Sequence, residues 1–352
     1  MDRPTSTDVA RLAGVNQSTV SLVLSGRAAG RVSLTLQDKV RAAAAQLRYQ
    51  PSNSARALRS GQARAIGLLV PDITNPFVGL VMHGAQEAAW QQDLAVMLME
   101  SGDGQGRHRR ALEAMHRGLV DGTLLFAAVP GATPRSEFGP TVLIEVEKRG
   151  FPSVLLDSAQ GMRDAVSCLR GAGHKRIAYL GVGSGRWTFE RRKQQWRTEM
   201  RAAGLPDSMI ADAPALTLDA ARGAALHLLQ NDGAPATAIV CADDILASGA
   251  LWAAGALGVR VPDELSLIGF AGTLVGRSMV PALTTVVAPA AELGATGVEL
   301  LSAVIEGKKI ALRTVLPVRL EIRDSVAAAP YRGSRVRRIS VRDGRRKGVV
   351  RR

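Results

Sequence analysis

The chain has 352 residues, 46% of them hydrophobic, and a formal net charge of +14 at pH 7. This length and apolar content predict a globular protein with two or three folding units. The two cysteines, Cys168 and Cys241, lie far apart in the sequence, which excludes a disulfide framework and gives no sign of a zinc site. We therefore expect no metal and no cofactor.

The positive charge is concentrated at the two ends. Residues 1–64 carry ten Arg and Lys against three Asp, a net +7, and residues 331–352 carry ten against one Asp, a net +9, which leaves −2 between them. This distribution is typical of a protein that meets phosphate backbones through its ends. The N-terminus lacks the apolar core of a secretion signal and no run of eighteen apolar residues follows, so we expect a cytoplasmic, nucleoid-associated protein with no membrane contact.

The segment Ser6–Leu24 predicts a helix-turn-helix. Its apolar residues fall into two helical periods on either side of Gly14, which can take the positive φ that the turn needs. Val20 would fill the space between the helices. Amide and hydroxyl side chains on the second helix can read base edges in a major groove. The expected DNA contacts in this segment are Thr7, Asn16, Gln17, Ser18, Thr19 and Ser21.

A third helix is predicted over Leu36–Leu47, with Ser33 as a cap before it. It is Ala-rich and amphipathic, and it would complete an all-α, three-helix DNA-binding headpiece over residues 1–50. A lone helical hairpin can also be purely structural, so the DNA-binding interpretation needs support from the rest of the chain.

From Ala65 onward, short apolar β-rich runs alternate with helical stretches. This order predicts parallel sheets with both faces covered, and hence an α/β core of two doubly wound lobes over residues 62–330. Ligands of such sheets bind beyond the carboxyl ends of the strands. The predicted strands cover residues 65–70, 94–99, 122–127, 153–157, 176–182, 237–242 and 265–270.

Four strings along the chain are similar to the LacI/GalR family of transcription regulators. They are DVARLAGV, STVSLVLSG, RYQPSNSARALRSGQARAIGLLVPDITNPF and RVPDELSLIGF, in that order. The resemblance implies a periplasmic-binding-protein-like core with an effector cleft between the lobes, a homodimer, and a hinge helix or linker over residues 51–61. It also implies a sequence-specific regulator, in most relatives a repressor, on a palindromic operator.

The hinge helix implied by the resemblance is Pro51–Ser60, which would push Leu58 into the minor groove. Asn53, Arg56 and Ala57 lie beside it as further DNA contacts. An apolar wedge between base steps kinks DNA at a cost that added contacts repay. The alternative is a plain linker helix whose leucine packs on the core.

The resemblance also implies effector contacts. Asn75 and Phe77 follow the first strand at the cleft mouth, Arg192 matches an arginine that grips effector oxygens, and Asp243 stands where relatives commonly have Asn. Phe77 could equally be a core residue. Arg192 could equally be a surface arginine in the basic string ERRKQQWR.

Several family features are missing. Leu22 replaces an arginine common in the recognition helix, so the operator of a relative does not carry over. Ala271 replaces an aspartate that accepts sugar hydroxyls, Leu218 replaces a pocket aromatic, and the family's strand after Asp157 is absent. We expect a cleft that is re-specialised for another ligand or has lost its ligand.

Three other functions are compatible with parts of this sequence. The GVGSG string at 181–185 is a weak phosphate-loop signal, and the five histidines show no metal spacing, so an enzyme is not expected. An exported ligand-binding module would lack the basic headpiece. A regulator without an effector, its core only a dimer platform, stays open. The basic tail, residues 331–352, is expected to be disordered and to add non-specific DNA affinity.

Overall fold

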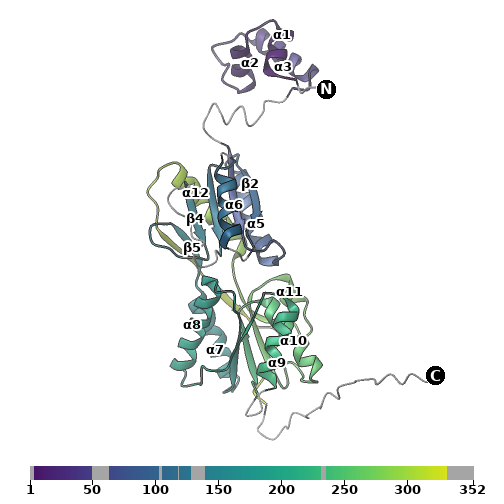
Figure 1. Ribbon diagram of the computed structural model, residues 1–352, viewed down its shortest axis with the longest axis vertical. Coiled ribbons are helices and arrows are strands. Elements are labelled where there is room, and N and C mark those ends of the chain that lie inside the picture. The colour runs from purple at the N-terminus through teal and green to yellow at the C-terminus, as the bar shows by residue number, and fades with distance from the viewer. Residues whose placement is uncertain are drawn as a thin grey trace, which may run out of the picture. The chain divides into compact units, whose positions relative to one another are not determined.

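The computed structural model describes residues 4–49, 63–102, 105–117, 119–127, 139–230 and 235–330. The chain forms two compact units, Met1–Arg64 and Ala65–Arg352 (Figure 1). The predicted hinge contacts Asn53, Arg56, Ala57 and Leu58 lie outside the described residues, as does the tail at 331–352.

The first unit, the headpiece, contains the helices α1 (Ser6–Ala13), α2 (Gln17–Leu24) and α3 (Leu34–Gln46). Thr5 caps α1: its hydroxyl accepts from the Asp8 amide, and the Asp8 carboxylate accepts from the Thr5 amide at 2.9 Å. Gly14 ends α1 at φ 67°, a conformation that favours glycine. Val20 is 1% exposed in the core shared by the three helices. The helix-turn-helix prediction is confirmed.

The second unit contains two lobes, each built on a six-stranded sheet. In lobe 1 the order is β11-β5-β4-β3-β1-β2 and every pairing is parallel. Apolar residues of α5 (Pro76–Trp90) belong to the hydrophobic cluster on one face of this sheet. Apolar residues of α6 (Gln105–His116) pack with Leu69, Leu125 and Leu143 in a separate hydrophobic cluster on the opposite face. The elements of lobe 1 are β1 (Ala65–Val70), α5 (Pro76–Trp90), β2 (Ala95–Glu100), α6 (Gln105–His116), β3 (Gly122–Phe126), β4 (Thr141–Ile144), β5 (Ser153–Leu156), α12 (Ala290–Ile305) and β11 (Arg313–Leu316).

Lobe 2 has the order β12-β10-β9-β8-β6-β7, with only β12 antiparallel to its neighbour. Its core is contiguous with that of lobe 1. The elements are α7 (Ser158–Gly171), β6 (Ile177–Val182), α8 (Trp187–Ala202), β7 (Ile210–Ala213), α9 (Leu218–Leu229), β8 (Ala238–Cys241), α10 (Asp244–Ala256), β9 (Ser266–Ala271), α11 (Leu274–Ser278), β10 (Thr284–Val287) and β12 (Arg319–Glu321).

The chain passes between the lobes three times: from β5 to α7, from β10 to α12, and from β11 to β12. At the first passage α7 begins at Ser158, directly after Asp157, which caps it. The expected absence of a strand here is therefore seen in the structure. The two-lobed parallel-sheet prediction is confirmed, and all seven predicted strands are present; β4, β7, β10, β11 and β12, each of three or four residues, were not predicted.

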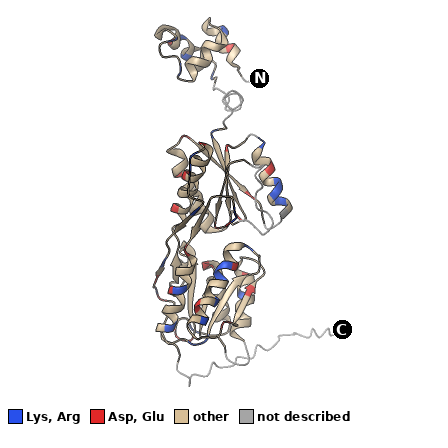
Figure 2. Ribbon diagram, turned by 90° about the vertical axis from the view of Figure 1, so that its left-hand side faces the viewer, with Lys and Arg blue, Asp and Glu red and all other residues tan. Residues whose placement is uncertain are grey.

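Acidic and basic residues both occur along the ribbon of each lobe (Figure 2). None of the helices in the described part of the chain is long and apolar enough to cross a membrane.

Candidate functional site

Helix α2 carries most of the DNA contacts predicted for the headpiece. Asn16 is its N-cap, and the Asn16 Oδ1 atom accepts from the Thr19 amide at 3.0 Å and from the hydroxyls of Ser18 and Thr19 at 2.8 and 2.6 Å. This satisfies a backbone donor at the helix start. The side-chain Oδ1 atom of Asn16 is therefore used within the headpiece. Its side-chain NH2 group is the part that remains to contact DNA.

Gln17 and Ser18 are exposed, whereas Thr19 and Ser21 are half-buried. The Gln17 side-chain amide donates to the Ser6 hydroxyl at 2.7 Å, so the starts of α1 and α2 are tied together and Gln17 Oε1 keeps a fixed direction. Ser6 was not predicted, because contact between residues eleven apart has no signature in helical spacing. Thr7 is exposed in the first turn of α1. The hydrogen bond from Gln17 to Ser6 therefore brings the polar residues at the start of α1 next to those at the start of α2.

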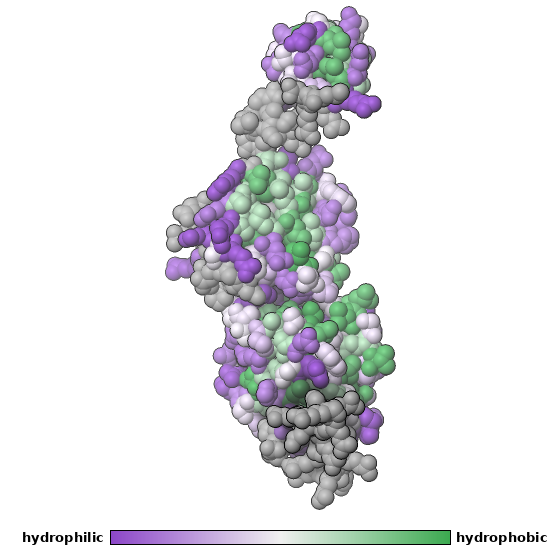
Figure 3. Space-filling model, turned by 45° about the vertical axis from the view of Figure 1, so that its right-hand side comes forward, coloured by the Kyte–Doolittle hydropathy of each residue, from purple (hydrophilic) through white to green (hydrophobic). Residues whose placement is uncertain are grey.

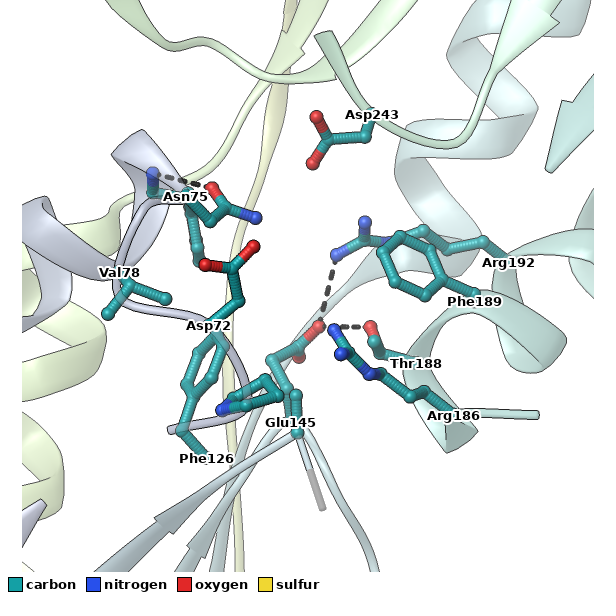
Figure 4. A pocket seen from close by; sticks show the side chains of 13 residues that line it. Asp72, Asn75, Val78, Phe126, Glu145, Arg186, Thr188, Phe189, Arg192 and Asp243 are labelled. Carbon is teal, nitrogen blue, oxygen red and sulfur yellow. Dashed lines mark hydrogen bonds and ion pairs between the residues drawn. The ribbon is translucent and has the colours of Figure 1, made fainter. Parts of the chain in front are cut away.

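In the core unit, a cleft lies between the lobes (Figure 4). It is lined by residues that follow the carboxyl ends of parallel strands, where ligands of such sheets bind. Strands β1, β3 and β4 contribute from lobe 1, and β6 and β8 contribute from lobe 2. The lining residues are Pro71, Asp72, Asn75, Phe77, Val78, Phe126, Ala127, Glu145, Arg186, Thr188, Phe189, Arg192 and Asp243.

A buried ion pair joins the two lobes across the cleft. Arg192 on α8 lies 3.1 Å from Glu145 Oε2, and the two side chains are 7% and 4% exposed. The guanidinium also donates to the Ala242 carbonyl at 2.9 Å and lies over the Phe270 ring, 3.7 Å from its centroid. Arg192 is therefore not a surface arginine. Its charge is already matched by a carboxylate of the same chain.

Glu145 is held from both lobes. Its Oε1 atom accepts from the Leu156 amide of lobe 1 at 2.7 Å, and Oε2 accepts from the Thr188 hydroxyl of lobe 2 at 2.7 Å. Its φ of 56° is uncommon for a residue other than glycine and costs on the order of 1 kcal/mol. The sequence reasoning missed Glu145, although a carboxylate directly after the apolar run TVLI was the available signal.

Asp243 is 5% exposed at the lobe 2 side of the cleft and caps α10, accepting from the Ile245 amide at 2.8 Å. Burial, and next the neighbouring Asp244 carboxylate, raise the pKa of Asp243 to about 7. Asp244 itself is held by Thr273 and Thr285, so it is a structural residue. Asp243 therefore presents a carboxyl group that burial disfavours in its charged form.

The other predicted cleft residues are also brought to this site. Asn75 caps α5 through the Phe77 amide at 2.9 Å, and the Phe77 ring is 6% exposed with its centroid 6.2 Å from that of Phe126. Phe77 is thus both a core residue and part of the cleft wall. Leu218 and Ala271, two of the departures noted in the sequence, are not among the lining residues.

Comparisons with known proteins agree with this architecture. Residues 5–52 match the family "Bacterial regulatory proteins, lacI family", and residues 166–326 match "Periplasmic binding protein-like domain". The HTH-type transcriptional regulator DegA of Bacillus subtilis is 31% identical over 332 residues, covering 91% of this chain and 97% of that protein. Catabolite control protein A of Priestia megaterium is 31% identical over 328 residues, covering 90% and 98%.

Two solved structures are similar over nearly the whole chain. The Lac repressor bound to ONPG in the repressed state has a TM-score of 0.81 at 25% identity, covering 92% of this chain and 100% of that one. A complex of the regulator CelR with cellobiose has a TM-score of 0.68 at 26% identity, with coverage of 92% and 100%.

Proposed function

The chain belongs to the lacI family of bacterial regulatory proteins, and from that premise we propose that it represses transcription by binding a palindromic operator as a homodimer. It is a DNA-binding transcription regulator and not an enzyme. We place it with the nucleoid in the cytoplasm, where its DNA would be.

The observation that carries the proposal is the polar start of α2. Gln17 and Ser18 are exposed next to the cap formed by Asn16, and the Gln17 side chain is oriented by Ser6. Amides can recognise adenine edges and hydroxyls can contact several bases, so this helix end suits a major groove. Thr7, Thr19 and Ser21 are proposed as flanking contacts. Because Leu22 is uncharged, discrimination would rest on these polar groups.

We assign residues 1–50 to DNA reading, 51–61 to a hinge, and 62–330 to effector binding and dimerisation. In the hinge, Leu58 is proposed to enter the minor groove, with Asn53, Arg56 and Ala57 beside it. For residues 331–352 we propose added non-specific DNA affinity, motivated by their net +9. Removing them should then flatten the dependence of DNA affinity on salt concentration, and an unchanged slope would end that idea.

Exposed apolar side chains support the dimer. Met97 and Leu98 on the edge strand β2 are 39% and 42% exposed, and Trp252 and Leu274 of lobe 2 are 48% and 76% exposed. Apolar surface is visible on both lobes (Figure 3). A second copy of the chain covering these residues would remove them from water, as homodimer interfaces do. The oligomeric state measured by analytical ultracentrifugation tests this point.

The cleft is proposed to bind an effector through Asn75, Phe77, Asp243 and the residues around the Glu145–Arg192 pair. The alternative is a regulator that needs no effector. The Glu145–Arg192 ion pair favours this alternative, because it already joins the two lobes without a ligand. The two are separated by whether any small molecule changes operator affinity or thermal stability.

The primary test is selection of genomic fragments by the purified full chain, followed by footprinting. We expect a palindromic site whose half-sites lie one helical turn or a multiple of it apart, since a two-fold dimer imposes that symmetry. Recovery of fragments without a shared site would contradict the proposal, and the basic ends would then serve general nucleic-acid contact.

A further inference from the structure

The charges that line the cleft are not balanced. Three carboxylates, from Asp72, Glu145 and Asp243, face two guanidiniums, from Arg186 and Arg192. Arg192 is committed to Glu145 and to a backbone carbonyl, so those two charges cancel within the protein. Asp72 and Asp243 have no ion pair among the described residues. The negative groups left for a ligand to meet on this side of the cleft are therefore the Asp72 carboxylate and the Asp243 carboxyl group, whose pKa burial raises to about 7 and which a bound cation would help to ionise.

Asp72 and Asp243 come from opposite lobes and point into the same space, with the Asn75 side chain beside them (Figure 4). Asp72 is half-buried after β1, and its Oδ1 atom accepts from the amide and hydroxyl of Thr74 at 2.8 and 2.6 Å. One oxygen of Asp243 is bound to the Ile245 amide. Each carboxylate is thus held in place by the protein and keeps a second oxygen that can accept from a ligand.

Aromatic rings complete the wall. Phe77, Phe126 and Phe189 line the cleft, and all three are less than 8% exposed. Ring faces attract cations and also shield the carbon chain of a ligand from water.

Ligand classes can be ranked from this arrangement. An anion would approach the carboxyl groups of Asp72 and Asp243, whereas Arg192 is already paired with Glu145 and Arg186 lies beside Glu145 (Figure 4), so an anion is disfavoured at this end of the cleft. A neutral polyol could donate to the same oxygens but would leave their charge unmatched in a buried site. A cation with N–H groups both neutralises the charge and satisfies the acceptors.

Resting on the proposed function, we propose that the effector of this cleft is a small organic cation, with an ammonium or amidinium group bound between Asp72 and Asp243 and its carbon chain against the phenylalanines. The cation bridges the two lobes in the same cleft as the Glu145–Arg192 pair. Its binding would add a second, ligand-dependent connection between lobes that one internal pair already joins.

The test is titration calorimetry of the full chain, at physiological salt, with three four-carbon probes that differ only in their end groups. These are 1,4-diaminobutane, 1,4-butanediol and succinate; agmatine and choline extend the cationic set. We expect saturable binding of at least one cation, about tenfold or more tighter than butanediol, and no binding of succinate.

Asp72→Asn and Asp243→Asn should each weaken cation binding by about tenfold or more. Both keep the hydrogen-bonding shape, and Asn is as good a helix cap as Asp. Glu292→Gln, on an exposed part of α12 outside the cleft, is the control and should leave binding unchanged. Thermal unfolding of each variant without probe verifies that it is folded.

Three results would overturn the inference: binding of butanediol or succinate as tight as that of the cations, cation binding that both Asp variants leave unchanged, or no binding of any cation in the millimolar range. Operator binding is measured separately on the fragment selected above. A cation-binding core without an operator would refute the regulator proposal alone, and an operator-binding protein that ignores cations would refute this inference alone.

Discussion

The headpiece and the cleft place their functional side chains in opposite ways. In the headpiece, the candidate contacts from Asn16 to Ser21 lie on consecutive positions of one helix start, oriented by hydrogen bonds within the headpiece. In the cleft, Glu145 and Arg192 are 47 positions apart and meet only because the end of β4 in lobe 1 faces α8 of lobe 2. DNA reading can therefore change through single local substitutions, whereas ligand recognition depends on how the lobes are held.

The largest effect that separates the two regions is expected from Arg192→Leu. It leaves Glu145 as a buried, unmatched charge, which should lower the free energy of unfolding of the core by about 3–5 kcal/mol. Urea unfolding measures this, with the headpiece helices unaffected. In the double variant with Glu145→Gln the loss should be smaller than for Arg192→Leu alone. A loss below about 1 kcal/mol would mean that the pair does not hold the lobes.

A second effect concerns the proposed hinge. Leu58→Ala should weaken operator binding by about thirtyfold, close to 2 kcal/mol, and non-specific binding much less. Fluorescence anisotropy on operator and on scrambled DNA gives both values. Equal weakening on the two DNAs would favour the plain linker helix. The proposal that Leu58 enters the minor groove would then be wrong.

A third effect is the pH dependence of stability at Asp243. Its pKa is raised from 3.8 to about 7 in the folded chain, chiefly by burial and next by Asp244, with Arg192 opposing. Between these values the folded state holds a proton that the unfolded state has released, so this group's contribution to stability falls as pH rises through that window and is constant above it.

Asp243→Asn removes that dependence. The variant should match the native chain near pH 4 and be more stable by on the order of 4 kcal/mol at pH 8, measured by urea unfolding across the pH range. Asn preserves the helix cap, so the difference isolates the charge. A gap that does not grow with pH would show that the Asp243 carboxyl group titrates normally in the fold.

The headpiece could be predicted from the sequence more fully than the cleft. The helix-turn-helix was predictable because its signals are local: two helical periods, a turn glycine and a plugging Val20. Seven strands were predicted from short apolar runs. The strand Thr141–Ile144 was missed, and Glu145 at its end with it, although its three apolar residues in a row equal those of the predicted strand Ser153–Leu156, because so short a run does not distinguish a strand from other buried structure.

The cleft residues were predicted only in part for a related reason. Asn75, Phe77, Arg192 and Asp243 were expected from family resemblance, and all four line the cleft. Their roles were not predictable, because the partner that neutralises Arg192 and the burial that shifts the pKa of Asp243 arise from tertiary contacts. Asp72 and Thr188 carried no sequence signal that set them apart from ordinary loop and helix residues.

The most direct test of the central claim is the ratio of operator to non-specific affinity for two matched variants, Gln17→Ala and Gln46→Ala. Both remove an exposed glutamine amide from the headpiece, one at the start of α2 and one at the end of α3. The account predicts that Gln17→Ala lowers the ratio by about tenfold, within the range of about 1–3 kcal/mol for one base contact, while Gln46→Ala leaves it unchanged. Equal ratios for both variants would contradict the claim that the start of α2 reads the DNA.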